Sequence, residues 1–347
     1  MWFLAGYAIG LLPYGPLGAH FGNRKVTLVA LVISMFFAAL CFLPVPLHSL
    51  GLFHIFRFLL GFSMSIGLKM AFSYIGKCYL DSEIAKMSSY LITSFALAPS
   101  ISVFMTGWLV SWLGYLGALL FQFFYCVFVF FLARKLPPDQ PEAMVSIHRS
   151  YVFSTFKSCF TNPRIAIPGI LISLSTSLIY LFATESPFIA IDYLKLSPGV
   201  FGVLYFLTFW GALSGGILSG KTAHLLPRRV FIGIGIVIMS LGSLVTFFLF
   251  ISNKVSVYSL FIPMFFILVG SSYYYANAVS IAMEQKLNKS YISSTIQFIN
   301  MGITTLFVFL LSILHPTNLL VMPTLFLIIL LISIVFSFIL TKYTKEA

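Results

Sequence analysis

The stretch that decides the fold reads Gly15-Pro16-Leu17-Gly18-Ala19-His20-Phe21-Gly22-Asn23-Arg24-Lys25-Val26 and follows a first apolar run. Its plan returns as Ser219-Gly220-Lys221-Thr222-Ala223-His224-Leu225-Leu226-Pro227-Arg228-Arg229-Val230. A single offset of 204 residues aligns an Ala-His pair, two basic residues and a valine in both stretches. We interpret the chain as two related parts, a construction that some transporters use. The alternative is two basic turns that are similar by accident.

The composition around this repeat excludes a soluble protein. Only 8% of the 347 residues are charged and 60% are hydrophobic, and the mean hydropathy is +1.04. A soluble domain carries roughly 25% charged residues and has enough of them to cover its surface. A cytosolic enzyme, a secreted disulfide scaffold and a disordered tail are therefore excluded.

The apolar residues form continuous runs of the length that crosses a bilayer as a helix, about 20 residues. The sequence predicts an all-α polytopic membrane protein with about 11 transmembrane helices. The predicted spans are 2–18, 26–47, 51–76, 88–112, 114–133, 166–184, 198–219, 230–252, 257–282, 291–313 and 319–340.

One connection is much longer than the others, and it divides the chain. Residues 134–165 contain prolines, acids and several basic residues. We predict an N-terminal transmembrane half at 1–133, a cytoplasmic linker at 134–165 and a six-helix C-terminal half at 166–347.

The basic residues predict the orientation of the chain. Sixteen of the 20 Lys and Arg residues fall on one side of the predicted spans, two fall on the other, and Arg57 and Lys69 lie within a span. Because cytoplasmic loops are enriched in Lys and Arg, this split predicts a cytoplasmic C-terminus in a cell inner membrane. It also explains the net charge of +12 without a nucleic-acid partner.

The opening stretch resembles the signature between the second and third helices of the major facilitator superfamily, Gly-x-Leu-small-Asp-Arg-x-Gly-Arg-Lys. The positions that carry the resemblance are Gly15, Gly18, Gly22, Arg24 and Lys25. The resemblance implies two pseudo-symmetric helical halves, with these residues acting as a cytoplasmic gating motif.

Further motifs extend the resemblance along the whole chain. Arg57-Phe58-Leu59-Leu60-Gly61 stands where the family has Arg-x-x-Gln-Gly, and Pro99 with Gly107 resembles the fifth-helix motif of drug–proton antiporters. The segments Glu185-Ser186-Pro187-Phe188 and Leu196-Ser197-Pro198 are similar to the Bcr/CflA drug-resistance subfamily. The resemblance implies a drug:proton antiporter.

The chain also departs from these patterns. Ala19 replaces the Asp of the signature, Leu60 replaces the Gln, and Val103 and Thr106 replace a proline and a glycine. From the resemblance we expect that the first helix of the twelve-helix fold is absent, and in this subfamily that helix usually carries an acid implicated in proton coupling. We therefore keep open a truncated, non-transporting remnant, or a chain begun at the wrong Met.

Three charged side chains in or beside spans are candidates for the substrate or proton pathway, because a charge in a span costs about 2.5–3.5 kcal/mol on insertion scales. Arg57 either faces a central path or extends to the headgroups. Lys69 either attracts anions or extends to the cytoplasm. Glu185 is either a protonatable site or a hydrated loop carboxylate.

Polar and aromatic residues within the spans are candidates for the lining of the pathway. A lining with aromatic rings and few charges suits amphipathic organic solutes, whereas the alternative role is hydrogen bonding between helices. The candidates are Tyr180, Tyr273, Tyr274, Asn277, Gln297 and Asn300.

No spacing in the sequence predicts a metal site, a cofactor site or a nucleophile with its base. Cys41, Cys78, Cys126 and Cys159 fit reduced structural thiols, and we predict a protein without enzymatic activity. We predict a monomeric, proton-coupled secondary transporter that exports small organic molecules or drugs by alternating access. The alternatives are a metabolite or siderophore exporter or facilitator of the same fold, the remnant named above and, more distantly, an integral-membrane enzyme.

Overall fold

The computed structural model describes residues 2–44, 47–67, 69–71, 74, 81–137, 148–222, 225–287, 289–314 and 318–344. Within these ranges the chain is helical and contains no β-strand. The repeat partners Ala223 and His224, together with Cys78, lie outside the described residues, as do residues 138–147 of the predicted linker.

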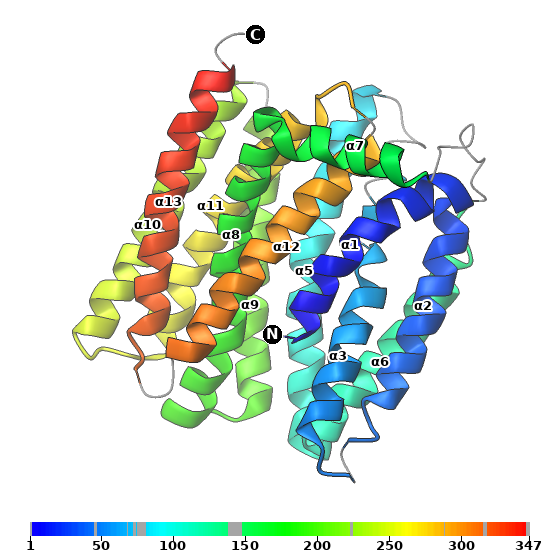
Figure 1. The fold of residues 1–347 in the computed structure, drawn as a ribbon. Helices are drawn as coiled ribbons and strands as arrows, with labels where there is room; N and C mark the ends of the chain where they lie inside the picture. Colours follow the sequence, from blue (N-terminus) through cyan, green and yellow to red (C-terminus); the bar gives the residue numbers. More distant parts are fainter. Residues whose placement is uncertain are drawn as a thin grey trace.

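Figure 1 shows two groups of long helices side by side, with the helices of each group running in roughly the same direction. The first group comprises α1 (Trp2–Phe21), α2 (Asn23–Leu40), α3 (Leu50–Met64), α5 (Asp81–Leu113) and α6 (Tyr115–Ala133). The second group comprises α8 (Pro163–Pro187), α9 (Pro198–Thr222), α10 (Arg228–Ile251), α11 (Val257–Met283), α12 (Lys289–Leu314) and α13 (Val321–Thr344), with the short π-helix η1 (Phe188–Tyr193) after α8.

Each of the eleven predicted spans coincides with one of these helices. Nine helices in the described ranges are long and apolar enough to cross a membrane, so the predicted count of about 11 is not confirmed. The other two helices are α1, which contains Pro13 and Pro16, and α5, whose apolar part is limited to Leu97–Leu113. Proline within a membrane helix is tolerated because neighbouring groups satisfy the freed backbone.

The signature stretch is more helical than the predicted spans imply. The predicted first span ends at residue 18, but α1 continues to Phe21 and α2 begins at Asn23. Only Gly22 separates the two helices, with a φ of 89°. Glycine adopts this left-handed conformation without the steric penalty that a side chain brings, which explains a turn of one residue.

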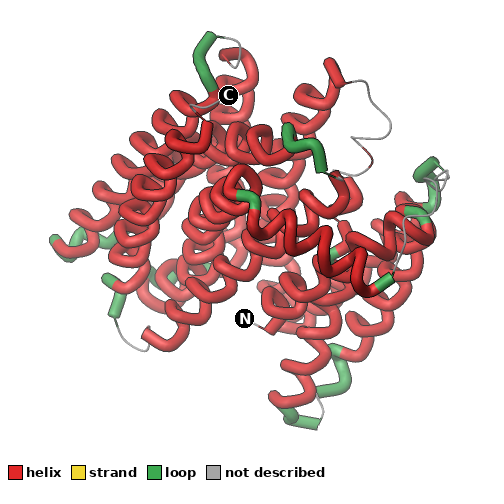
Figure 2. Tube along the Cα trace, turned by 45° about the horizontal axis from the view of Figure 1, so that its top comes forward, coloured by secondary structure: helices red, strands yellow, loops and turns green. Residues whose placement is uncertain are grey.

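The predicted linker contains a helix that the apolar runs of the sequence do not predict. Helix α7 (Arg149–Thr161) lies within 134–165, and Figure 2 shows it running across the molecule between the two groups. Its sequence mixes aromatic, basic, Ser and Thr residues, so it presents no apolar run that would mark a span.

The two groups meet mainly along two pairs of helices, α1 with α12 and α5 with α9, and α5 also contacts α11. Small residues permit the approach: a Cβ on Gly15 would lie 2.9 Å from Ser294 Oγ, and one on Gly107 would lie 2.7 Å from the carbonyl oxygen of Pro198. Close backbone approach at small residues is typical of helix packing in membranes. We call this contact zone the seam.

Pro99, the other residue of the predicted fifth-helix motif, lies eight residues before Gly107 in α5, and its side chain is exposed.

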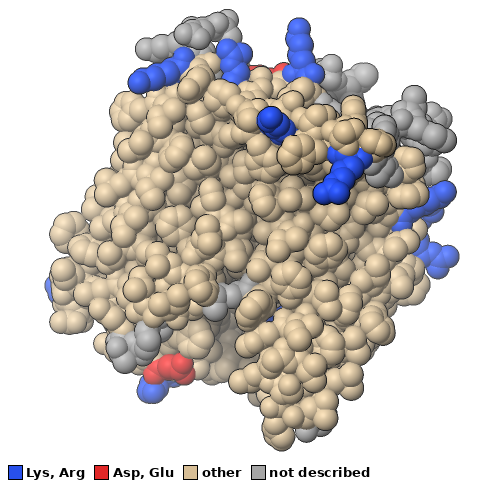
Figure 3. Space-filling model, viewed as in Figure 1, with Lys and Arg blue, Asp and Glu red and all other residues tan. Residues whose placement is uncertain are grey.

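Burial differs between the helices. Helices α8 and α11 are buried over most of their length, whereas α2, α6, α10 and α13 expose many large apolar side chains. Figure 3 shows a surface dominated by uncharged residues, with Lys and Arg gathered mainly along the upper edge and upper right. An uncharged belt below a charged rim is the arrangement expected of a helix bundle in a bilayer.

Candidate functional site

Two buried amides mark the candidate site on α12. Gln297 Nε2 donates to the Tyr275 hydroxyl of α11 at 3.2 Å, and Asn300 Nδ2 donates to Gln297 Oε1 at 3.1 Å. All three side chains are less than 9% exposed. Spacing of three residues places Gln297 and Asn300 on the same face of α12, which explains why the two amides join one network.

Phenol groups from four helices form the rest of the site, and one of them, that of Tyr275, contacts the amides directly. Tyr7 of α1 and Tyr180 of α8 pack against the same buried residues, which include Leu11 and Met301. Tyr180 also interacts electrostatically with Tyr205 and Tyr275. The ring of Tyr205 stacks on Phe182, with ring centroids 5.8 Å apart. We define the seam cluster as Tyr7, Tyr180, Tyr205, Tyr275, Gln297 and Asn300, to which the first group contributes α1 and the second contributes α8, α9, α11 and α12.

The seam cluster is polar but uncharged. Its phenols and amides can both donate and accept hydrogen bonds. Asn300 is fully buried, and its Oδ1 accepts no hydrogen bond from the part of the chain that the structure describes. A buried acceptor without a donor is unfavourable by about 1–3 kcal/mol, so this oxygen is a position at which a solute hydroxyl or amide would be stabilised.

The structure brings only part of the predicted lining into this cluster. Tyr180, Gln297 and Asn300 are in it, whereas Tyr273 stacks on Phe231 of α10 with centroids 5.9 Å apart. A Cβ on Gly235 of α10 would lie 2.9 Å from Tyr274 Cβ. The Asn277 side chain donates to the Tyr273 carbonyl at 2.7 Å. Tyr273 and Tyr274 therefore face α10, and among the residues that the structure describes these contacts do not join the three to the seam cluster.

Arg57 lies in the first group and has its own partners. Its Nη1 donates to Gln122 Oε1 of α6 at 2.5 Å. The guanidinium carbon is 5.5 Å from the ring centroid of Phe53 and 6.0 Å from that of Phe3. Hydrogen bonding and cation–π contacts both stabilise a cation away from water. Gln122 could not be predicted from the sequence as a partner of Arg57, because their contact depends on how α3 and α6 pack.

Lys69 is fully buried and does not extend to the surface. A Cβ on Gly18 would lie 2.8 Å from Lys69 Nζ and 2.6 Å from Asn23 Oδ1. The absence of a side chain at this signature glycine therefore makes room for the amine and the amide together. Ala19, which replaces the signature acid, belongs to the same turn of α1.

The basic residues of the two repeats occupy corresponding helix junctions. Arg24 Nη2 donates to the carbonyl oxygen of Arg134 at 2.8 Å and so ties α2 to the end of α6, while Lys25 is exposed. In the second repeat, Arg228 at the start of α10 forms an ion pair with Glu284 at the end of α11. Both contacts lie at the surface, where ion pairs contribute little stability.

Glu185 is 2% exposed and lies in the last turns of α8. Its carbonyl oxygen accepts a hydrogen bond from the Phe188 amide at the start of η1. The side chain is therefore a buried carboxylate in this structure and not a hydrated loop group. In the described ranges, no three His, Cys, Asp or Glu residues gather in a way that could hold a metal.

Comparison with known proteins gives the class to which this arrangement belongs. The model of the Major Facilitator Superfamily matches residues 1–303. The xylose transporter XylE from E. coli, in a partially occluded inward-open conformation, superimposes with a TM-score of 0.68 at 15% sequence identity, covering 99% of this chain and 87% of XylE. The fold is thus that of a helical transporter. The chain belongs to the major facilitator superfamily.

Relatives in sequence include two resistance proteins. The chloramphenicol resistance protein CraA of Acinetobacter baumannii is 25% identical over 244 residues, which are 70% of this chain and 58% of CraA. A bicyclomycin resistance protein homolog of Haemophilus influenzae is 25% identical over 109 residues, 31% of this chain and 27% of that protein. The family model confirms the predicted superfamily, and the resemblance to drug-resistance proteins is shared with these two relatives. Family membership also confirms the prediction of a transporter that is not an enzyme.

Proposed function

We propose that this protein is a proton-coupled secondary transporter that exports uncharged small organic molecules by alternating access. The observation that carries the proposal is the seam cluster, because it joins α1 of the first group to four helices of the second. A solute held there contacts both groups. Residues 1–133 and 166–347 would be the moving halves, and the protein would act as a monomer.

The chemistry of the seam cluster favours a neutral, amphipathic solute. Its rings offer stacking surfaces and its amides offer hydrogen bonds, while none of its six side chains carries a charge at neutral pH. The names of CraA and the bicyclomycin resistance homolog support the same class of solute. The cluster is largely closed to solvent in this structure, so loading requires the two groups to separate.

Substitution of Gln297 by leucine tests the site. Leucine retains the approximate volume but removes the hydrogen bonds to Tyr275 and Asn300, whose buried polar atoms then lose their partner. We expect the rate of chloramphenicol export from cells to fall at least about tenfold, since a lost buried hydrogen bond corresponds to about 1–3 kcal/mol. Gln285→Leu, at the end of α11, is the matched control. Wild-type export by Gln297→Leu at equal protein level would exclude the seam cluster as the site.

We propose that the face carrying α7 and the C-terminus is cytoplasmic and that the membrane is a cell inner membrane. Arg149, Lys157 and Lys342 lie on that face, and positive charge favours the cytoplasmic side. The test uses a variant of the protein without its native cysteines. Tyr258→Cys places one thiol at the start of α11, on the face opposite α7, and we expect an impermeant maleimide to label it in intact cells. Tyr343→Cys should react only after permeabilisation. The reverse pattern would contradict the orientation.

A further inference from the structure

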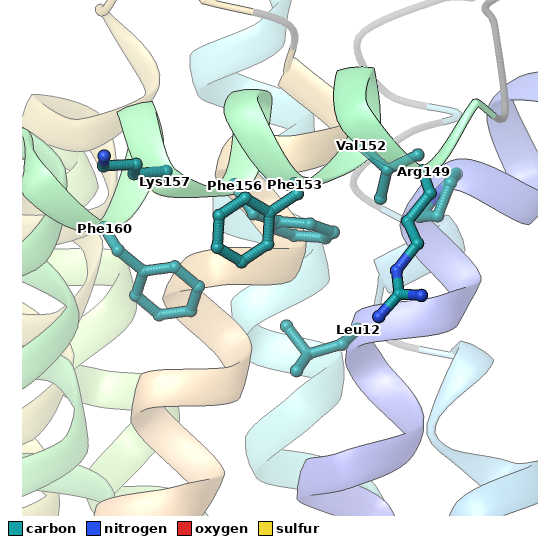
Figure 4. A pocket seen from close by; sticks show the side chains of 8 residues that line it. Leu12, Arg149, Val152, Phe153, Phe156, Lys157 and Phe160 are labelled. Atoms are coloured by element: carbon teal, nitrogen blue, oxygen red, sulfur yellow. The ribbon is translucent and has the colours of Figure 1, made fainter.

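A groove of about 650 Å³ opens between α7 and α1, away from the seam cluster. Leu12 and Pro16 of α1 form one wall, and Val152, Phe153 and Phe156 of α7 form the other. Figure 4 shows the rings of Phe153, Phe156 and Phe160 below α7, with Leu12 of α1 beyond them. The volume lies within the roughly 300–1,000 Å³ range of ligand pockets.

Helix α7 is fixed to the second group, whereas α1 belongs to the first. Phe156 packs on Tyr291 of α12 with ring centroids 5.0 Å apart, and Phe160 packs on Phe298 with centroids 5.8 Å apart. These two ring contacts hold α7 against α12, because paired aromatic side chains bury large apolar surfaces against each other. An occupant of the groove therefore touches both helix groups at once.

The charges at the groove are of one sign. Arg149 and Lys157 belong to its lining, and neither the lining nor the whole of α7 contains an acid. In Figure 4 the Arg149 guanidinium extends into the groove beside Leu12. The Lys157 amine lies at the other end of the groove and points away from the rings. The groove thus combines an apolar interior with two cations at its edge.

We infer that this groove binds an anionic phospholipid of the surrounding bilayer. The phosphate lies against Arg149, whose guanidinium enters the groove, and Lys157 adds positive charge at the other end of the rim. An acyl chain lies against Phe153, Phe156 and Phe160. Figure 3 shows Lys and Arg gathered along the upper edge of an uncharged surface, which is the depth at which headgroups lie. A short helix with aromatic and basic residues is suited to this interface. The bound lipid holds α7 to α1 and favours the arrangement of the two groups seen here.

The inference is tested on the purified full chain by native mass spectrometry during titration with phosphatidylglycerol. Phosphatidylcholine with the same acyl chains tests the need for net negative charge, and glycerol 1-phosphate as competitor tests the need for the chains. We expect phosphatidylglycerol to bind most tightly and millimolar glycerol 1-phosphate to leave it bound. Equal affinity for the two lipids, or displacement by glycerol 1-phosphate, would overturn the inference.

Variants locate the binding in the groove. Arg149→Gln with Lys157→Gln should weaken phosphatidylglycerol binding about 25-fold, at about fivefold for each cation near a membrane surface. The control Lys221→Gln with Lys342→Gln removes the same charge from exposed positions on other helices and should change binding less than twofold. Phe153→Ser should also weaken binding, and it should leave the fold intact because this ring is 70% exposed. Equal weakening by the two double variants, or unchanged binding by Phe153→Ser, would contradict the assigned groove.

Discussion

Replacing Glu185 by glutamine is expected to abolish uphill export while leaving the protein folded and able to exchange solute downhill. Among the acidic side chains that the structure describes, Glu185 alone is buried. Glutamine preserves its size and its capacity for hydrogen bonds but cannot release a proton. A carboxylate inside a membrane bundle is a functional-site candidate by default, and in our proposal Glu185 carries the coupled proton.

The measurement is solute accumulation in everted vesicles that are acidified inside. We expect accumulation by Glu185→Gln to fall to the level of vesicles without the protein, and solute exchange at zero gradient to continue. Asp192→Asn is the matched control, because Asp192 is exposed seven residues further along the chain, and it should accumulate solute as the wild type does. Uncoupler-sensitive accumulation by Glu185→Gln would exclude Glu185 as the coupling residue.

Replacing Gly61 by valine is expected to cause the largest loss of stability. A Cβ on Gly61 would collide with the backbone carbonyl of Phe3, and one on Gly6 would collide with the backbone carbonyl of Phe58. Helices α1 and α3 thus approach backbone to backbone through two glycines. Since a carbonyl cannot rotate out of the way as a flexible side chain can, the helices would have to separate. Overpacking destabilises by about 1–3 kcal/mol, and we expect the upper part of this range because two backbones must move apart.

Gly51→Val provides the matched control for this prediction. Gly51 also lies in α3, but a Cβ there would meet nothing within 4 Å, so both substitutions change helix propensity in the same way. We expect Gly61→Val to lower the thermal unfolding midpoint strongly or to prevent recovery of monodisperse protein, and Gly51→Val to resemble the wild type. Equal midpoints for the two variants would contradict the close packing of α1 on α3.

Much of the fold could be predicted because the bilayer imposes strong constraints on length and polarity. The continuous apolar runs located eleven helices, and the paired signature stretches located two corresponding junctions, α1–α2 and α9–α10. Helix α7 was missed because its Phe residues alternate with Ser, Thr and basic residues over only 13 positions. A membrane span is recognised by a continuous apolar run of about 20 residues, and α7 contains no such run.

The candidate site was predicted less completely because apolar helices give little sign of which face looks inward. Tyr273, Tyr274 and Tyr275 are consecutive, so they point in directions about 100° apart. We selected the first two, whereas Tyr275 makes the hydrogen bond to Gln297. Helix α11 is buried on most sides, which removes the amphipathic pattern that would have distinguished them. Tyr7 and Tyr205 were missed for the same reason.

Transport by purified protein in liposomes tests the central claim most directly. Liposomes with an acidic interior would be given radiolabelled chloramphenicol outside, so that protons leaving the liposome can drive solute entry. We predict accumulation that an uncoupler abolishes, that Gln297→Leu lowers at least about tenfold and that Gln285→Leu leaves unchanged. Accumulation that is insensitive to the uncoupler would contradict proton coupling, and equal accumulation by Gln297→Leu and the wild type would contradict the seam cluster as the solute site.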